Sequence, residues 1–430
     1  MGRMGWIAAA ALALAAGPAF GQEAAPAVAD AADTAWILTA TGLVLFMTLP
    51  GLALFYAGLV RSKNVLSVMM HCVAIACLVS VLWLLGAYSL AFSGTHPLIG
   101  DLSKFALVSV GRADLSGELP ESLFFMFQMT FAIITPALII GAFVERIKFG
   151  AVLLFSGLWS LVVYAPVCHW VWGGGWLMDR SVMDYAGGLV VHATAGVSAL
   201  VIAWRLGPRD GYPKDLSPPH APHLTFIGAA MLWVGWYGFN AGSALAADGN
   251  AAAALTATHL SAATAGLVWA LIEKLRFKRA SMVGLVTGVI AGLATVTPAS
   301  GFVGPIGGVV LGALGSLVCY QAVEFVKKRT GIDDSLDVFA VHGVGGILGT
   351  LAVSVLAAKE FGGAGYAEGV DMAGQAVTQA LGVLATIAWS AIVTLVICVV
   401  VAKTVGLRAR DEQIEDGLDM SAHGERAYNP

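Results

Sequence analysis

Two histidines within apolar segments stand at matching distances from an aspartate. Asp184 precedes His192 by eight residues, Asp334 precedes His342 by eight residues, and a glycine follows each histidine four residues later. Imidazole is the side chain whose proton exchange falls near neutral pH. The matched pair is therefore the strongest candidate for proton chemistry in the sequence, provided that the fold brings the two rings together.

The positions of the histidines predict a common depth in a membrane. If the segments 187 to 205 and 337 to 357 cross it in opposite directions, a rise of 1.5 Å per residue carries each histidine about 12 Å from opposite faces. Half of a hydrocarbon core is about 15 Å, and an ionisable side chain at that depth is a functional candidate. The alternative is two unrelated histidines that bond to backbone groups inside a bundle.

A second group of candidates combines aromatic rings with two polar side chains. Spacings of three and four residues place the members of one segment on one helical face. A membrane-interface belt would explain Trp172 but not the polar Gln128 and Ser243 among rings, so a lined vestibule is the preferred interpretation. The group comprises Phe127, Gln128 and Phe131, then Trp172, then Trp236, Phe239 and Ser243.

These residues also indicate which substrate could cross. Ring faces attract a small cation by about 0.5–2 kcal/mol, whereas taking a bare ion into the interior costs on the order of 20 kcal/mol in the idealised case. No Asp or Glu stands in the middle of an apolar segment to compensate the charge. Desolvation lowers the pKa of an ammonium-like group from about 10 towards neutrality. Ammonium could therefore lose its proton and continue as a neutral molecule, which Na⁺ and K⁺ cannot do.

The elements that position these residues must be membrane helices. The chain is 58% hydrophobic and only 12% charged, with a mean hydropathy of +0.82. Apolar runs of about twenty residues or more exceed the strand length of a membrane barrel, so the sequence predicts an all-α membrane protein. A net charge of -4 shows no basic excess for nucleic acid, and five cysteines without CxxC spacing indicate packing rather than a metal or redox site.

The chain divides into three parts. Residues 1–21 have the pattern of a secretory signal peptide, with Arg3 before a short apolar stretch and small residues up to Gly21. Residues 22–405 are predicted to form the transmembrane domain, and residues 406–430 a cytoplasmic tail. The domain holds eleven apolar segments: 34–58, 65–92, 121–144, 150–170, 187–205, 223–246, 252–272, 281–298, 303–326, 337–357 and 375–402.

Charge placement predicts the orientation of these segments. Of the 23 Lys and Arg residues, 18 fall in the tail or in the connections after odd-numbered segments, and four fall on the other side. The positive-inside rule then places the N-terminus in the periplasm and the C-terminus in the cytoplasm.

The two Asp-His pairs with the same spacing predict an internal repeat, and this matching pattern is called the Asp-His echo. Five segments separate them, so the copies run in opposite directions, as in inverted-topology repeats with a shared site near the midplane. The expected fold is two inverted five-helix repeats plus a C-terminal helix. Asp184 is well suited to cap a helix, worth about 1 kcal/mol, and it could also keep the vestibule negative; architecture is taken as its main role.

Four stretches in this order resemble the ammonium transporter family of Amt, Mep and Rh proteins. The resemblance covers essentially the whole mature chain. The stretches are FQMTFAIITPALIIGAFVERIKF (127–149), DYAGGLVVHATA (184–195), WVGWYGFNAGSA (233–244) and DDSLDVFAVHGVGGILGT (333–350).

The resemblance implies a role for each candidate. Trp172, Phe131 and Ser243 would form an outer recruitment site, and Phe131 and Phe239 would be stacked gating rings above Trp236. His192 and His342 would be the twin histidines of the pore. Asp184 would be the recruitment-site or structural aspartate, and Gln128 a polar vestibule residue beside Phe127.

The resemblance also implies the setting in which the protein acts. It would be a transporter rather than an enzyme, without a cofactor, and a homotrimer in the bacterial inner membrane with NH₄⁺ or NH₃ as substrate. The tail stretch EDGLDMSAHGERAY is similar to that of members blocked by a PII signal protein. Two alternatives remain: an ammonium sensor that signals through such a partner, and a membrane haem or metal protein with the two histidines as axial ligands.

Overall fold

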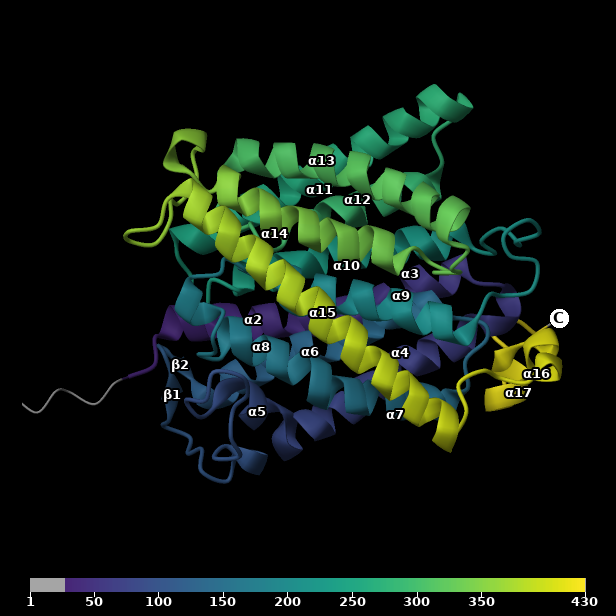
Figure 1. The fold of residues 1–430 in the computed structure, drawn as a ribbon, viewed down its shortest axis with the longest axis horizontal. Coiled ribbons are helices and arrows are strands. Elements are labelled where there is room, and N and C mark those ends of the chain that lie inside the picture. The colour runs from purple at the N-terminus through teal and green to yellow at the C-terminus, as the bar shows by residue number, and fades with distance from the viewer. Residues whose placement is uncertain (1–27, 430) are drawn as a thin grey trace, which may run out of the picture.

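The structure is a computed structural model that describes residues 28–429 and is built almost entirely of helices (Figure 1). The predicted signal peptide, residues 1–21, lies outside the described residues. The helices of the first half are α2 (Ala31–Phe46), η1 (Met47–Leu52), α3 (Ala53–Leu59), η2 (Ser62–Asn64), α4 (Val65–Leu82), η3 (Trp83–Ala87), α5 (Tyr88–Phe92), η4 (Phe105–Leu107), α6 (Glu121–Phe143), α7 (Phe149–Trp159), η5 (Ser160–Tyr164), α8 (Ala165–Trp172), η6 (Met178–Arg180), η7 (Gly188–Ala193) and α9 (Thr194–Leu206).

The second half continues in the same way. Its helices are α10 (Pro222–Gly242), α11 (Gly249–Phe277), α12 (Met282–Val296), α13 (Pro305–Phe325), η8 (Val326–Thr330), η9 (Phe339–Gly343), α14 (Val344–Leu356), η10 (Lys359–Phe361), α15 (Met372–Thr404), α16 (Asp411–Asp416) and α17 (Leu418–His423). Two short strands before α6, β1 (Leu115–Ser116) and β2 (Leu119–Pro120), pair antiparallel with Leu115 opposite Pro120.

Each of the eleven predicted segments coincides with a helix or a run of consecutive helices. Within residues 28–429, nine of these stretches are long and apolar enough to span a membrane. Segments 223–246 and 281–298 correspond to α10 and to the shorter α12, which fall outside those nine. The prediction of an all-α membrane protein is confirmed, and the count of eleven spans stays a prediction.

Side chains near the helix ends explain where several spans begin. Asp30, Asp248, Ser281 and Asp371 each accept hydrogen bonds from first-turn N–H groups, at α2, α11, α12 and α15. Proline stands in the first turn of α10 and α13, where its missing N–H costs nothing.

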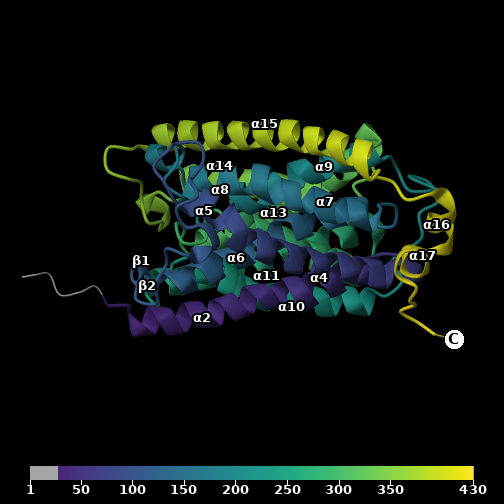
Figure 2. The same ribbon diagram turned by 90° about the horizontal axis from the view of Figure 1, so that it is seen from below.

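The two ends of the described chain lie at opposite ends of the bundle (Figures 1 and 2). The end beside Asp30 is called the N-side and the end beside the tail the C-side. Connections that carry the basic residues meet at the C-side. Arg61 pairs with Glu145 at 3.0 Å, Arg209 pairs with Asp333 at 2.9 Å, and the tail hydrogen-bonds to the α6–α7 connection. These basic connections therefore lie at one end of the bundle, while the cytoplasmic location of that end stays a prediction.

The 33-residue helix α15 crosses the bundle obliquely in Figure 1 and lies on the opposite face from α2 and α10 in Figure 2. Gln379 on α15 accepts from Met183 N at 2.8 Å and donates to Met183 O and Thr350 O. The helix outside the predicted repeats therefore holds the segment just before Asp184 in place.

The two segments that carry the histidines meet at glycines. A Cβ atom at Gly196 would lie 2.2 Å from Gly343 Cα, and one at Gly346 would lie 2.6 Å from His192 Cβ. Only glycine permits backbones to approach so closely. Gly196 and Gly346 each follow a histidine by four residues, so the matched pattern has a physical cause at the contact between the halves.

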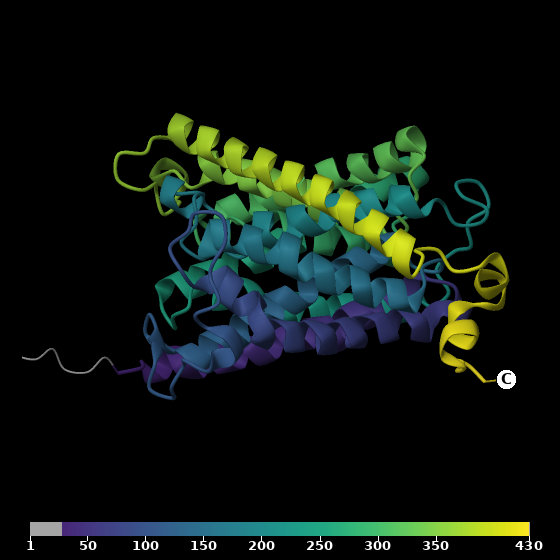
Figure 3. The same ribbon diagram turned by 60° about the horizontal axis from the view of Figure 1, so that its bottom comes forward.

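Residues 406–429 are packed against the C-side rather than extended into solvent (Figure 3). The buried Asp419 carboxylate accepts from Leu66 N at 3.0 Å and Ser67 N at 2.7 Å, in the first turn of α4. Leu418 N donates to Asn64 Oδ1 at 2.8 Å. The polar composition of the tail favoured a solvated segment, but its aspartate caps a helix distant in sequence.

Candidate functional site

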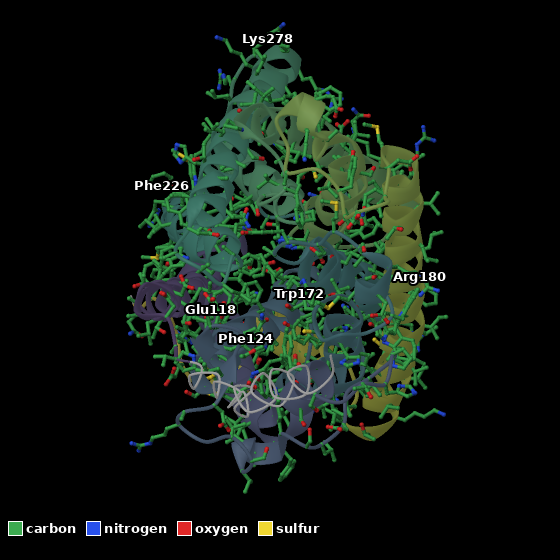
Figure 4. All side chains as sticks on the ribbon, turned by 90° about the vertical axis from the view of Figure 1, so that its left-hand side faces the viewer. Glu118, Phe124, Trp172, Arg180, Phe226 and Lys278 are labelled. Carbon is green, nitrogen blue, oxygen red and sulfur yellow. The ribbon has the colours of Figure 1, made fainter. Side chains whose placement is uncertain are left out.

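A cavity of about 180 Å³ opens at the N-side. Trp172 lies near the middle of this face in Figure 4, and Phe124 lies beside it. Four of the predicted residues line the cavity, and several that the sequence did not single out join them. The lining comprises Phe92, Phe124, Gln128, Phe131, Val171, Trp172, Met178, Tyr185, Ser243 and Leu245.

Two phenyl rings lie beneath this cavity. The Phe131 and Phe239 centroids are 4.3 Å apart with an interplanar angle of 31°, and Trp172 meets Phe131 edge-on at 5.8 Å. Both phenyl rings are almost fully buried. Trp172 Nε1 donates to Asp184 O at 2.8 Å, and Ser243 Oγ donates to Phe239 O at 2.8 Å. The hydrogen bonds fix the orientation of the indole and the hydroxyl at the cavity wall.

The remaining two candidates of this group are placed differently from each other. Phe127 is fully buried, packs edge-on against Phe131 at 5.1 Å and is not part of the lining of the N-side cavity or of the two cavities described below. It therefore supports the ring below the cavity instead of facing it. Gln128 does line the cavity, and its Oε1 has no hydrogen-bond partner among the described residues.

Beyond the phenyl rings lies a middle cavity of about 10 Å³, which has room for roughly one water-sized molecule. This middle cavity is lined by His192, Trp236, Phe239 and His342 together with aliphatic side chains. Trp236 lies nearly parallel to His192, with centroids 5.6 Å apart, and its Nε1 donates to Thr297 Oγ1 at 2.9 Å. The sequence prediction that Trp236 lies deeper than Phe239 agrees with this placement.

The two histidine rings lie against each other. Their Nδ1 atoms are 3.3 Å apart, and the ring centroids are 5.2 Å apart with an interplanar angle of 18°. In this hydrogen bond one Nδ1 carries the proton and donates, and the other Nδ1 is unprotonated and accepts. Axial ligands lie on opposite sides of a metal ion, so nitrogens at about 2.0 Å from it would be about 4 Å apart. The two Nδ1 atoms are closer than that, so this geometry does not fit the axial-ligand alternative. His192 Nε2 is buried without a partner among the described residues.

Each histidine stands in a π-helical turn, η7 or η9. Such turns widen the helix locally and are frequent at functional sites. The Asp184 carboxylate accepts from four consecutive backbone N–H groups, those of Gly187, Gly188, Leu189 and Val190. Burial raises the pKa of Asp184, while the four N–H groups act in the opposite sense. Asp334 accepts from Val338 N and Phe339 N, so the predicted echo extends to the capping of both turns.

A third cavity, of about 230 Å³, opens at the C-side and reaches His342. Sequence reasoning missed its polar lining, which includes Arg209, Lys327, Ser335 and Asp337. Lys327 Nζ lies 2.7 Å from Asp337 Oδ2, and burial raises the pKa of Asp337 although Lys327 opposes that change. The motif that contains Asp334 and His342 also contains Asp337, but no sequence spacing connected that residue to Lys327.

These features define a class of protein: a multi-pass helical membrane protein in which a small, mostly apolar cavity beside two histidines lies between two wider cavities. The chain belongs to the Ammonium Transporter Family, whose family model matches residues 35–428. The chain is 46% identical over 401 residues to the "Ammonium transporter" of Bacillus subtilis, covering 92% of this chain and 98% of the relative. It is 43% identical over 399 residues to "Ammonium transporter Amt1" of Archaeoglobus fulgidus, with coverage of 92% and 99%.

Solved structures of the same kind share the fold. Mep2 of Candida albicans matches with a TM-score of 0.83 at 36% identity, covering 90% of this chain and 88% of that one. A structure titled "Sensor Amt Protein" matches with a TM-score of 0.84 at 28% identity, covering 91% and 98%.

Proposed function

We propose that this protein moves ammonium across the bacterial inner membrane by separating the proton from the ammonia. NH₄⁺ is recruited at the N-side cavity by Trp172, Phe131 and Ser243. Beyond the phenyl rings NH₄⁺ transfers its proton to an imidazole nitrogen of the His192 and His342 pair. NH₃ passes the same two side chains to the C-side cavity, where it takes up a proton again. No covalent step and no cofactor are needed.

The observation that carries the proposal is the order of groups along the passage. An aromatic cavity with a hydroxyl and an amide comes first, then two phenyl rings in contact at 4.3 Å between centroids, and then two imidazoles with one water-sized space beside them. Of the three cavities, only the C-side cavity is lined by acidic and basic side chains. Ring faces attract a cation by about 0.5–2 kcal/mol, which is far below the cost of carrying a bare charge through the apolar stretch. A hydrogen-bonding neutral molecule avoids that cost.

The proposal predicts selective flux and a defined effect of the outer site. Reconstituted protein under an ammonium gradient should carry flux that an equal K⁺ gradient does not produce. A pH-sensitive dye in the lumen, read together with the current, separates NH₃ flux from proton-coupled flux. Trp172→Leu removes the indole face and should raise the half-saturating ammonium concentration by about threefold to tenfold, as expected for an interaction of roughly 1 kcal/mol.

The matched control is Trp204→Leu, because Trp204 is exposed on the bundle surface and lines none of the cavities described above. It should leave flux unchanged. Equal currents with K⁺ and with ammonium would contradict the proposed selectivity.

We further propose the assembly and regulation that accompany transport in this family: a homotrimer with a periplasmic N-side and a cytoplasmic C-side, and a PII signal protein that binds the C-side. The packed tail supports this regulation, because α16 and α17 present an ordered surface at the C-side, where residues of the tail line a separate pocket with Ser62 and Lys63. A sensor that signals through the PII partner is the second candidate, and the likeness to a sensor Amt structure favours keeping it.

Deleting residues 411–430 tests the tail. The spanning helices should still fold, because the tail contacts only their C-side ends, while PII affinity should fall and the flux should no longer respond to PII. Co-purification and flux measured with and without PII report the two effects. Unchanged PII affinity in the truncated protein would show that PII binds the C-side connections and not the tail.

A further inference from the structure

We propose that the connection after α5 is a membrane anchor that lies in the lipid leaflet on the N-side. Four large apolar side chains of this connection, Leu98, Leu102, Phe105 and Val108, are 52%, 59%, 46% and 84% exposed. These four residues are called the N-side anchor. So many exposed large apolar groups within eleven residues mark a surface that meets another apolar phase.

The N-side anchor lies against the flank of the bundle. In Figure 1 the chain between α5 and β1 lies beside the bundle near α5 instead of extending past the helix ends. Leu102 Cδ2 lies 3.8 Å from the position that a Cβ atom at Gly86 would take. Gly86 directly follows Leu84 and Leu85, two exposed leucines of a membrane-spanning stretch. The anchor therefore continues the apolar outer surface of the span Ser62–Phe92.

Polar contacts hold the anchor with its apolar side outward. The hydroxyl of Ser93 donates to Asp101 Oδ1 at 2.6 Å, Lys104 N donates to Ser89 Oγ at 2.9 Å, and Lys104 Nζ pairs with Glu121 at 2.7 Å. A connection that faces water would be expected to turn its charged groups outward and its leucines inward. Here the charged groups of Asp101 and Lys104 bond back to the bundle, and the apolar side chains point away from it.

The backbone at the anchor supports the same orientation. Ala106 and Leu107 adopt left-handed backbone conformations, with φ of 51° and 54°. Residues other than glycine rarely adopt this conformation. Leu107 packs against the core, while Phe105 and Val108 on either side of the turn stay exposed. The strained turn separates one inward side chain from two outward ones.

Lipid is the occupant that fits this surface. Its apolar groups continue those of a membrane-spanning face, and the exposed Arg112 follows them along the connection, as expected where an interfacial segment returns to the headgroups. Through Lys104 the anchor also holds Glu121 at the start of α6, the helix that supplies Phe124, Gln128 and Phe131 to the N-side cavity. The position of the leaflet is thus connected to the wall of the candidate recruitment site.

The test measures the depth of the anchor in a bilayer. The full chain, with the exposed Cys77 changed to serine and the other four cysteines buried, carries Val108→Cys labelled with an environment-sensitive fluorophore. It is reconstituted in vesicles of phosphatidylcholine and phosphatidylglycerol. The matched control is Arg112→Cys, an exposed position four residues further along the same connection.

Lipids with a nitroxide near the headgroup should quench the label at position 108, and aqueous iodide should quench it about threefold less than the label at position 112. Equal iodide quenching at both positions would show that the anchor faces water. Shielding from iodide without quenching by the nitroxide lipid would show that protein covers it. Either result overturns the proposal. Leu102→Cys serves as a second lipid-facing position and should give the same result as Val108→Cys.

Discussion

Replacing both His192 and His342 by alanine is expected to abolish proton-coupled ammonium current. Their Nδ1 atoms are 3.3 Å apart, and both rings line the water-sized space at the centre of the passage. Removing the rings breaks the chain of nitrogens that can hold ammonia and its proton, and it widens the passage beyond one small molecule. We expect ammonium current to fall by on the order of a hundredfold, the lower end of what a positioned proton-transfer group contributes.

The measurement is current from proteoliposomes under ammonium and K⁺ gradients, for each single variant and for the double variant. Each single variant should already lose most of the ammonium current, because one imidazole alone cannot form the pair. Leakage of K⁺ through the widened passage is the expected side effect. The control His259→Ala removes an exposed histidine that bonds to Tyr237 on the bundle surface, and it should leave the current unchanged.

A double variant that carried full, ammonium-selective current would contradict the twin-histidine mechanism. It would leave the family assignment untouched, because that rests on the whole chain. The same experiment therefore separates the mechanism from the coarser statement that the chain is an ammonium transporter family member.

The sequence predicted most of the fold because a membrane constrains it so strongly. Apolar length fixes the helices, basic residues fix the side of each connection, and the Asp-His echo placed two histidines at one depth. It also favoured a lined vestibule for Gln128, Phe131, Trp172 and Ser243, and all four line the N-side cavity. Spacing of three or four residues specifies the face of one helix only, so the grouping of three segments rested on the polar side chains among the rings and on the family resemblance.

Other parts depend on contacts that spacing does not encode. The stripe that contains Phe131 also contains Phe127, but only tertiary packing decides that the first ring faces the passage and the second supports it. The π-helical turns η7 and η9 follow from no simple periodicity. The C-side cavity brings Arg209 to Lys327 and Asp337 across more than a hundred residues. Several contacts hold the tail, among them an aspartate, Asp419, that caps α4. Pairings of this kind have no local signal.

The structure also changes what Asp184→Asn is expected to do. On sequence alone asparagine keeps the size and capping capacity of aspartate, so Asp184→Asn should be milder than Asp184→Ala if Asp184 is architectural. The carboxylate in fact divides four N–H groups between two oxygens, with Gly187 and Gly188 on Oδ1 and Leu189 and Val190 on Oδ2. Asparagine offers one oxygen, and its NH₂ group would face two N–H donors.

Asp184→Ala should therefore destabilise the protein severely, and Asp184→Asn should lie between alanine and the original residue. Each buried N–H left without a partner costs about 1–3 kcal/mol, so alanine loses several kcal/mol and asparagine about half of that. Thermal unfolding of the purified protein gives the order. Asp371→Ala is the control, because that exposed cap accepts from a single N–H and should cost only about 1 kcal/mol. If Asp184→Ala proved no more destabilising than Asp371→Ala but still lost ammonium flux, the charge at the vestibule and not the architecture would be the role of Asp184.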